Sequence, residues 1–304
     1  FLSTALQSSL AASICAKASG ADVPQPGALR ASAAALSITP KLGVSLDGYI
    51  MKLGPCTAIH DDLHTRCILL DDGKTQLVFV VNDLTCVPRE IFDRAKTLAA
   101  RATGIPESHM LMSATHSHSA PRVGVAKGPL DLKYEDFLVN QIAAAITEAQ
   151  QRLAPAKLGF GSVQVPDHVF NRRWYMKPGS IPPDPFGGGT DQVQFNPPVA
   201  SPDLVKPAGP VDPEVCFFSI KHADGRPLAL LANYSMHYAG GFKPGEISAD
   251  YFGVFARKIE QALGAPCVAA MSNGTSGNVG GGLDFTVIRP KQAPYEHMEN
   301  VGSR

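Results

Sequence analysis

Residues 110–121 have the sequence MLMSATHSHSAP, in which an apolar run is followed by a polar segment with two histidines. Residues 109–114 predict a short buried strand, which leads into a polar loop at Thr115. Alternate residues of an extended chain point to the same side, so His116 and His118 can converge at the carboxyl end of this strand. Ligands bind at that end in α/β sheets, and imidazole is the commonest metal-ligating side chain. We expect one metal ligand plus a proton carrier, or two metal ligands; the alternative is two polar residues in a turn.

The segments on either side alternate between strand and helix. Apolar residues at helical spacing predict helices, and apolar runs around Gly-containing turns predict hairpins. The expected hairpins span residues 67–81 and 215–233, the expected helices 89–102, 134–153 and 252–263, and the expected further strands 157–165 and 267–271. Hairpins together with strand-helix units predict an α/β (α+β) fold, with mixed β-sheets flanked by helices.

A second histidine, His237, follows the apolar residues 228–233, again where a strand is expected to end. Alone, such a histidine is more often a hydrogen-bonded core or rim residue. Because His116 shows the same pattern, two strand-end histidines of one sheet could share a metal ion. His60 lies in the sequence IHDDLH of residues 59–64, where no helix is expected, and is predicted to be a substrate-binding residue at the rim of the site.

The glycine-rich residues 273–281, NGTSGNVGG, follow another expected strand. Glycine lets backbone N–H groups approach a ligand, so Asn273, Gly274 and Ser276 are candidate substrate-binding residues. The sequence is neither a G-x-S-x-G nucleophile elbow nor a P-loop, and Ser276 would be a nucleophile only with a base beside it. Arg172 is a further candidate because a guanidinium binds anionic or carbonyl groups, although a surface arginine is the default interpretation.

The composition excludes some classes of protein. The chain has 27 Lys+Arg against 27 Asp+Glu, so its net charge does not provide nucleic-acid binding. It contains no apolar run of about 18 residues or more, so no transmembrane segment is expected. Its 304 residues are 44% hydrophobic, which is enough for a large buried core.

Several segments bear on the domain boundaries. Residues 1–35 are small and Ser/Ala-rich, with an A-x-A sequence at residues 16–18, which predicts the remainder of a signal peptide plus a linker and hence an exported protein. A frayed alanine-rich tail is the alternative. Residues 36–304 form the expected ordered domain, with a Pro/Gly-rich loop insert at about residues 176–213. Residues 294–301 predict the start of a helix close to the end of the chain, as in a piece of a longer protein.

Five sequence blocks together resemble the amino-terminal catalytic domain of the neutral/alkaline (non-lysosomal) ceramidase family. The blocks are Ile38-Thr39-Pro40, Ile59-His60-Asp61, Ala114-Thr115-His116-Ser117-His118-Ser119, Asn171-Arg172 and Ile247-Ser248-Ala249-Asp250-Tyr251. The Thr-His-x-His-Ser block is the most specific. The resemblance covers roughly residues 36–304, apart from the Pro/Gly-rich insert.

This resemblance implies a zinc-dependent amidase that splits an N-acyl bond. His116 and His237 match the zinc histidines, His118 matches a histidine that assists proton transfer, and Arg172 matches an arginine of the active-site pocket. Zinc lowers the pKa of bound water toward neutrality and polarises the amide carbonyl. The family's serine in the glycine-rich loop corresponds to Gly280 here, and its glutamate and tyrosine zinc ligands correspond to positions beyond this chain.

Three functions are therefore open for the same residues. The leading one is an exported hydrolase that uses Zn²⁺ and acts on a small-molecule or lipid amide. No nucleic-acid partner is expected. The second is an exported binding protein on the same fold, with catalysis lost through the change at Gly280. The third is a serine hydrolase that uses Ser276 with one of the histidines, and it would be indifferent to chelators.

Overall fold

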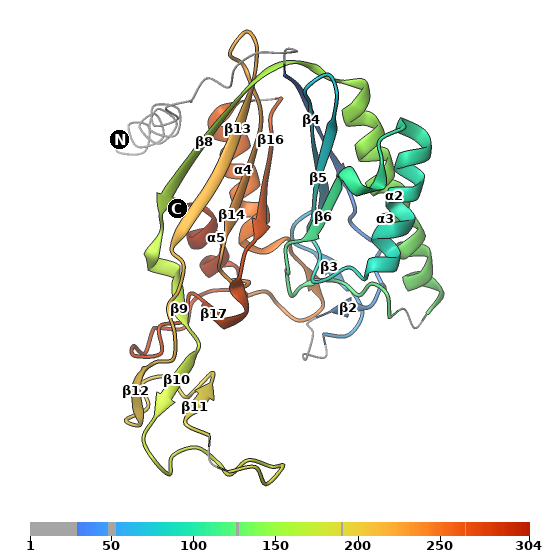
Figure 1. Cartoon of the computed structure of the whole chain (residues 1–304). Helices are drawn as coiled ribbons and strands as arrows, with labels where there is room; N and C mark the ends of the chain where they lie inside the picture. The colour runs from blue at the N-terminus through green and yellow to red at the C-terminus, as the bar shows by residue number, and fades with distance from the viewer. Residues whose placement is uncertain (1–28, 48–52, 126–127, 190, 265) are drawn as a thin grey trace.

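Two β-hairpins and four further strands build an eight-stranded mixed sheet (Figure 1). The structure is a computed structural model that describes residues 29–47, 53–125, 128–189, 191–264 and 266–304. The strands run in the order β16-β14-β13-β8-β1-β4-β5-β6. Their bounds are β1 (Arg30–Ser37), β4 (His64–Asp71), β5 (Gln76–Asn82), β6 (Met110–Ala114), β8 (Ala154–Gln164), β13 (Glu214–His222), β14 (Pro227–Tyr234) and β16 (Val268–Asn273). Antiparallel pairing of β4 with β5 and of β13 with β14 confirms both expected hairpins, and the expected α/β class is confirmed.

Strand β1 lies in a segment that we expected to be linker. It pairs with β4 over its whole length and with β8 at its first two residues, so residues 30–35 belong to the ordered domain that we expected to start at residue 36. The alanine-rich sequence is typical of linkers, but here the small side chains have a packing role. Ala34 is 1% exposed in the core cluster that includes helix α3 (Pro129–Gln151), and Ala31 is buried on the other face of the sheet.

The sheet folds over on itself, so that its two halves face each other (Figure 1). Alternating side chains of β4 point to the two faces of the sheet. Cys67 and Leu69 point into the core shared with α2 (Arg89–Thr103) and α3. Ile68 packs between the two halves of the sheet, with Ile220 and Leu228. A separate core covers β14 and β16 with α4 and α5. The fold therefore has four layers, with helices on both outer faces.

The helices are α2 (Arg89–Thr103), α3 (Pro129–Gln151), α4 (Asp250–Leu263) and α5 (Glu296–Gly302). They confirm the helices expected from spacing, and α2 ends at Gly104 in the left-handed conformation. Helix α3 begins earlier than expected, because Pro129 occupies its first position and the Asp131 carboxylate accepts the Gly128 N–H at 3.3 Å. Among the helices of the described residues, none is long and apolar enough to cross a lipid bilayer.

The Pro/Gly-rich insert is more ordered than the loop that we expected. It contributes β11 (Val193–Phe195) and β12 (Leu204–Pro207), which flank β10 (Arg173–Met176) in a three-stranded sheet at one end of the molecule (Figure 1). This sheet is stabilised by a small core of Trp174, Met176 and Phe285. Apolar residues between the prolines therefore outweigh the loop-like composition.

Short elements surround one end of the main sheet. The two-stranded pairs are β3 (Ala58–Ile59) with β15 (Glu246–Ile247), β9 (Val169–Asn171) with β17 (Val279–Gly281), and β2 (Leu46–Asp47) with β7 (Ala120–Pro121). The single-turn 3₁₀ helices at this end are η2 (Pro166–His168) and η3 (Ser276–Asn278), while η1 (Glu107–His109) precedes β6 at the opposite end. The glycine-rich loop that we expected thus contains β17 and η3.

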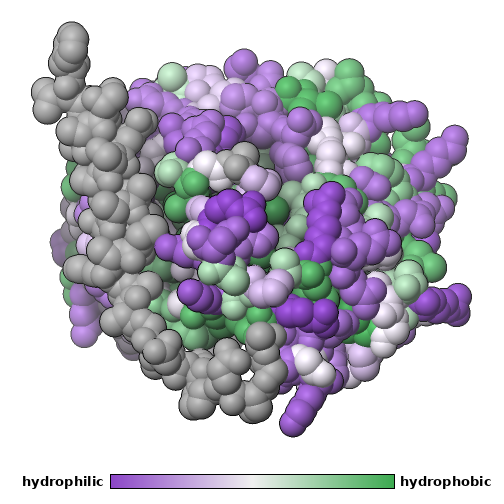
Figure 2. All heavy atoms as spheres, turned by 90° about the horizontal axis from the view of Figure 1, so that it is seen from above, coloured by the Kyte–Doolittle hydropathy of each residue, from purple (hydrophilic) through white to green (hydrophobic). Residues whose placement is uncertain are grey.

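The carboxyl ends of β6, β14 and β16 lie at this same end of the molecule (Figure 1). Strand β5 is parallel to β6, β14 is parallel to β16, and β16 contacts β6 across the fold. At the opposite end, hydrophilic side chains cover much of the surface, with hydrophobic ones in smaller patches (Figure 2). Because β6, β14 and β16 end at the same end of the molecule, the segments that follow these strands lie close together.

Candidate metal centre and active site

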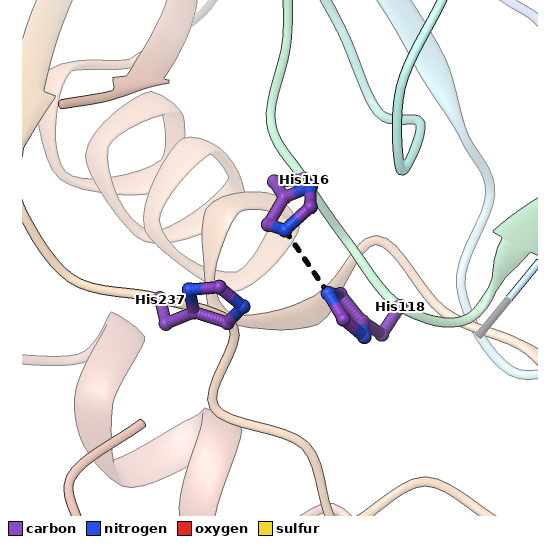
Figure 3. A group of neighbouring side chains, drawn as sticks. All are labelled: His116, His118 and His237. Atoms are coloured by element: carbon purple, nitrogen blue, oxygen red, sulfur yellow. Dashed lines mark hydrogen bonds between the residues drawn. The ribbon is translucent and has the colours of Figure 1, made fainter. Parts of the chain in front are cut away.

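Three histidine rings converge where β6 and β14 end (Figure 3). His116 and His118 follow β6 and His237 follows β14, and one ring nitrogen from each lies within 4.8 Å of the others. The Nε2 atoms of His116 and His118 are 3.1 Å apart. No other group of three or more His, Cys, Asp or Glu residues with this proximity occurs in the part of the chain that the structure describes.

His116 reaches the site through an unusual backbone conformation. Its φ is 69°, in the left-handed region that costs about 1–3 kcal/mol for a residue other than glycine. Its N–H donates to the Leu84 carbonyl at 2.9 Å, and its Nδ1 donates to the Thr85 carbonyl at 2.8 Å. The second bond places the lone pair of the neutral ring on Nε2. The two histidines do converge as expected, but through this bend after Ala114 and not by simple strand alternation.

His237 is held in a similar way from the other half of the fold. Its Nδ1 lies 3.3 Å from the Ser276 carbonyl oxygen, to which it donates, so the lone pair of the neutral ring is again on Nε2. Burial lowers the pKa of His237 to about 4, and the nearby Arg172 and His116 side chains lower it further. At neutral pH the ring is therefore neutral, which is the form that binds a metal ion.

His118 is enclosed by aromatic rings. Its ring stacks on Tyr238 with centroids 3.8 Å apart and planes 12° apart, and the side chain is 7% exposed. Tyr238 directly follows His237, so one tyrosine connects the two segments that carry the histidines. Tyr238 was not among the residues predicted for the site, and its position next to His237 is the only signal for it in the sequence.

The loop that carries His118 is fixed by its serines. The Ser117 hydroxyl donates to the Ser248 carbonyl at 2.8 Å, and the Ser119 hydroxyl donates to the Glu246 carbonyl at 2.6 Å. Both acceptors lie in or next to β15. The segment after β6 is thereby attached to a segment more than 120 residues away in sequence.

Asp250, the first residue of α4, supports the loop after His237. Its carboxylate accepts the N–H groups of Ala239 at 2.8 Å and Gly240 at 2.9 Å, and its φ of 55° is left-handed. The residue is fully buried, and burial raises the pKa of its carboxyl. The sequence placed Asp250 in the Ile247–Tyr251 motif but predicted no role for it, because nothing in the sequence links it to residues 239–240.

A pocket of about 920 Å³ opens beside His237. Its walls come from the loop after His237, from residues 280–294 and from the β10–β11 region. Arg172 and His237 are the predicted site residues that line it. Among the described residues, its lining does not include His60, Asn273, Gly274 or Ser276, and the substrate-binding role of those four stays a prediction.

Arg172 is positioned by backbone and aromatic contacts. Its Nε donates to the Gly277 carbonyl at 3.0 Å, and its Cζ lies 4.3 Å from the centre of the Phe195 ring. Burial lowers the pKa of Arg172, and the neighbouring Arg173 also lowers it, while Tyr238 acts in the opposite direction. The group still remains charged at neutral pH, because an arginine pKa lies far above 7.

Ser276 and His60 occupy different surroundings. Ser276 is 6% exposed, and its contact with His237 is made by its backbone carbonyl, which orients the ring and offers no nucleophile. The His60 ring packs on Tyr295 with centroids 3.5 Å apart. Gly280, at the position of the family's serine, forms part of the pocket wall beside Arg172.

Comparison with known proteins identifies the architecture. The neutral ceramidase of Pseudomonas aeruginosa is 22% identical over 268 residues, which are 84% of this chain and 36% of that protein. The crystal structure of neutral ceramidase from Pseudomonas aeruginosa superposes with a TM-score of 0.69 at 21% identity, covering 91% of this chain and 43% of that one. The chain has the ceramidase fold. A structure of ceramidase complexed with C2 gives the same TM-score at 20% identity, covering 91% of this chain and 42% of that one.

The resemblance to the ceramidases that we expected from the sequence is thus confirmed. No protein-family model matches the chain. The chain spans about a third of the length of the curated ceramidase and under half of the solved one.

The blocks that carried the ceramidase resemblance meet in space. Strand β3, before His60, pairs with β15, and the Ser248 hydroxyl donates to the Asp61 carboxylate at 2.5 Å. Asn171 pairs with Val279 in the β9–β17 ladder, next to the glycine-rich loop. The motifs therefore form one structural unit around the three histidines.

Proposed function

We propose that this chain carries the metal-binding part of a zinc-dependent hydrolase that cleaves an N-acyl amide bond with metal-activated water. The observation that carries the proposal is the convergence of His116, His118 and His237, each with a ring nitrogen within 4.8 Å of the others. The likeness to neutral ceramidase supports an amide of a ceramide-like lipid as the substrate.

His116 and His237 would hold the ion through Nε2. Each donates its Nδ1–H to a backbone carbonyl, which is the arrangement that orients metal-binding imidazoles. When bound, zinc polarises the amide carbonyl and makes water a nucleophile at neutral pH. Two histidines leave further positions of a tetrahedral site for other ligands and for water.

His118 would act as the proton carrier. It lies within hydrogen-bonding distance of His116, and stacking on Tyr238 fixes its ring plane. From there it would take a proton from the attacking water and give a proton to the nitrogen of the leaving amine. Arg172, whose guanidinium lines the pocket, orients the substrate.

The first experiment measures zinc per chain by elemental analysis of dialysed protein. We expect about one zinc in the parent protein, none in His116→Ala/His237→Ala, and an unchanged content in the control His222→Ala. A well-folded parent without zinc would contradict the proposal. The same preparations are then assayed with a short-chain ceramide.

His118→Ala separates a proton carrier from a third ligand. A proton carrier predicts retained zinc with hydrolysis lowered about 100-fold or more, since general acid-base catalysis typically contributes that much. A third ligand predicts that zinc affinity falls together with activity.

A non-catalytic binding protein on the same fold is the second candidate, and Gly280 favours it. The family's serine is absent at this position, so a serine-dependent step has no hydroxyl here. Zinc binding with no hydrolysis of any amide by the parent protein would support this candidate and contradict the hydrolase.

We also propose that the protein is exported, because residues 16–18 form an A-x-A sequence after a small apolar stretch. Residues 1–28 lie outside the described part of the structure. Expression from the complete reading frame, with amino-terminal sequencing of the product outside the cytoplasm, tests this. A product that keeps its amino-terminal segment and stays in the cytoplasm would contradict it.

A further inference from the structure

The pocket beside His237 carries more positive than negative side chains. Arg172, Arg289 and Lys291 line it, and Asp284 is the one acidic residue among its described lining residues. The Asp284 carboxylate accepts the N–H of Thr286 at 2.9 Å and its hydroxyl at 2.7 Å. Because the whole chain has equal numbers of acidic and basic residues, this excess is local to the pocket.

The two arginines are held by neutral groups. Arg172 Nε donates to the Gly277 carbonyl at 3.0 Å, and Arg289 Nη1 donates to the Gly282 carbonyl at 2.9 Å. Each guanidinium also lies over an aromatic ring, 4.3 Å from the centre of Phe195 for Arg172 and 5.6 Å from the centre of Phe170 for Arg289.

None of these three cations forms an ion pair within 4.0 Å with a carboxylate of the described residues. A guanidinium has five N–H donors, so most donors of Arg172 and Arg289 are available to a bound molecule. Fixed guanidinium groups bind carboxylates strongly, through charge-assisted and often bidentate hydrogen bonds.

The same pocket also presents apolar side chains. Leu283, Val287 and Ile288 line it and are 52%, 49% and 77% exposed. They lie in one segment with Arg289 and Lys291, which follow them, so apolar and cationic side chains are neighbours along a single wall. A ligand that suits this wall has an apolar chain and a negative charge.

We propose that, among N-acyl amides, this pocket prefers one whose amine portion carries a carboxylate, as in an N-acyl amino acid, over one with an uncharged amine portion, as in a ceramide. The apolar residues would contact the acyl chain, and Arg172, Arg289 and Lys291 would bind the carboxylate. The negative charge of the substrate would therefore lie on its amine portion and not on its acyl chain. This inference rests on the proposed hydrolase function for its catalytic part, but anion recognition can be measured without hydrolysis.

The test compares two probes of the same shape, N-hexanoylglycine and the neutral N-hexanoylglycinamide. Their binding to dialysed protein without added metal is measured by calorimetry at low salt. We expect the anion to bind about tenfold more tightly, which corresponds to about 1.4 kcal/mol. The preference should weaken as salt is added.

Arg289→Gln/Lys291→Gln is the informative variant, because both side chains are exposed and the substitutions retain hydrogen-bonding groups. It should bind the two probes within about twofold of each other. The control Arg101→Gln removes an exposed charge from α2 and should keep the preference of the parent protein. Equal binding of both probes by the parent, no binding of either, or a preference that survives in the double variant would overturn the proposal.

Hydrolysis by the zinc-loaded protein separates this proposal from the proposed function. Anion-selective binding without hydrolysis would leave the carboxylate site in place and contradict the hydrolase. Hydrolysis of both probes at equal rates and with equal affinity would support the hydrolase and overturn the carboxylate preference.

Discussion

Gly280 and Gly281 are neighbours in the pocket wall but differ in the space around them. A Cβ atom added at Gly280 would lie 3.7 Å from the Arg172 Cβ and from the Phe170 carbonyl oxygen, which is ordinary contact. A Cβ atom added at Gly281 would lie 2.0 Å from the Tyr238 carbonyl oxygen. The requirement for glycine is therefore steric at residue 281 and not at residue 280.

This difference predicts opposite outcomes for two serine substitutions. Gly280→Ser should leave the free energy of unfolding within about 0.5 kcal/mol of the parent, while Gly281→Ser should lower it by about 3 kcal/mol through overpacking. Urea unfolding followed by circular dichroism measures both. Equal destabilisation by the two variants would show that the wall around Gly280 is tighter than the structure indicates.

His168 is a second residue whose environment can be tested. It is 8% exposed, and neither ring nitrogen has a hydrogen-bond partner among the described residues. Burial lowers its pKa, and the nearby His297, Arg304 and Arg289 lower it further, with Asp167 opposing them. The folded state therefore favours the neutral ring.

His168→Phe should stabilise the protein, by about 1 kcal/mol at pH 7.5, because it removes unsatisfied polar atoms from a buried position. The gain should grow toward about pH 5. Below the unfolded pKa of about 6.5 the unfolded parent binds a proton that the folded parent resists, so the parent loses stability as the pH falls. Denaturant titrations at both pH values check this, and a gain that shrinks on acidification would contradict the assignment.

At the scale of elements, the amino-terminus of α4 supports the loop that follows β14. Asp250 belongs to the helix, while the N–H groups that it accepts belong to Ala239 and Gly240. Since His237 and Tyr238 immediately precede these residues, the helix determines where the second half of the site lies.

Asp250→Ala should lower the free energy of unfolding by about 3 kcal/mol, because the N–H groups of Ala239, Gly240 and Tyr251 lose their acceptor. It should also weaken metal binding because the loop after His237 loses its support, although Asp250 itself does not contact the proposed metal. Asp250→Asn keeps one acceptor oxygen in the same shape and should have a smaller effect on both quantities. Chemical unfolding and zinc titration measure them, and an alanine variant as stable as the asparagine variant would contradict this role.

At the same scale, the regular elements could be predicted from the sequence because the relevant signals are local. The spacing of Ile91, Ala95 and Ala99 predicted α2, and the apolar runs around residues 72–75 predicted the β4–β5 hairpin. Strand β1 could not be predicted, since its alanine-rich residues become a strand only by pairing with β4. The strands of the Pro/Gly-rich insert likewise depend on contact with Phe285, far along the chain.

For the whole molecule, the two halves of the folded sheet each contribute to one histidine cluster. His116 and His118 follow β6, at one edge of the sheet, and His237 follows β14, near the other. A metal ion bound by both segments would therefore stabilise the complete fold and not a single element.

Zinc at about 100 times its dissociation constant should raise the free energy of unfolding by about 2.7 kcal/mol. Thermal unfolding with and without zinc measures this as a rise in Tm, which should disappear in His116→Ala/His237→Ala and persist in the control His222→Ala. A zinc-dependent rise that survives in the double variant would locate the binding site elsewhere.

Periodicity and short motifs are properties of neighbouring residues, so the sequence alone was enough to predict the helices, the two hairpins, the mixed sheet, the resemblance to ceramidases and the candidate histidines. The folded chain was needed to show that His116 bends into the site at a φ of 69°, that the backbone carbonyls of Thr85 and Ser276 orient the rings, and that Asp250 fixes the loop after His237. Backbone carbonyls are common to every residue type, so no sequence pattern marks the ones that act. Their roles arise when the folded sheet brings the ends of β6, β14 and β16 together.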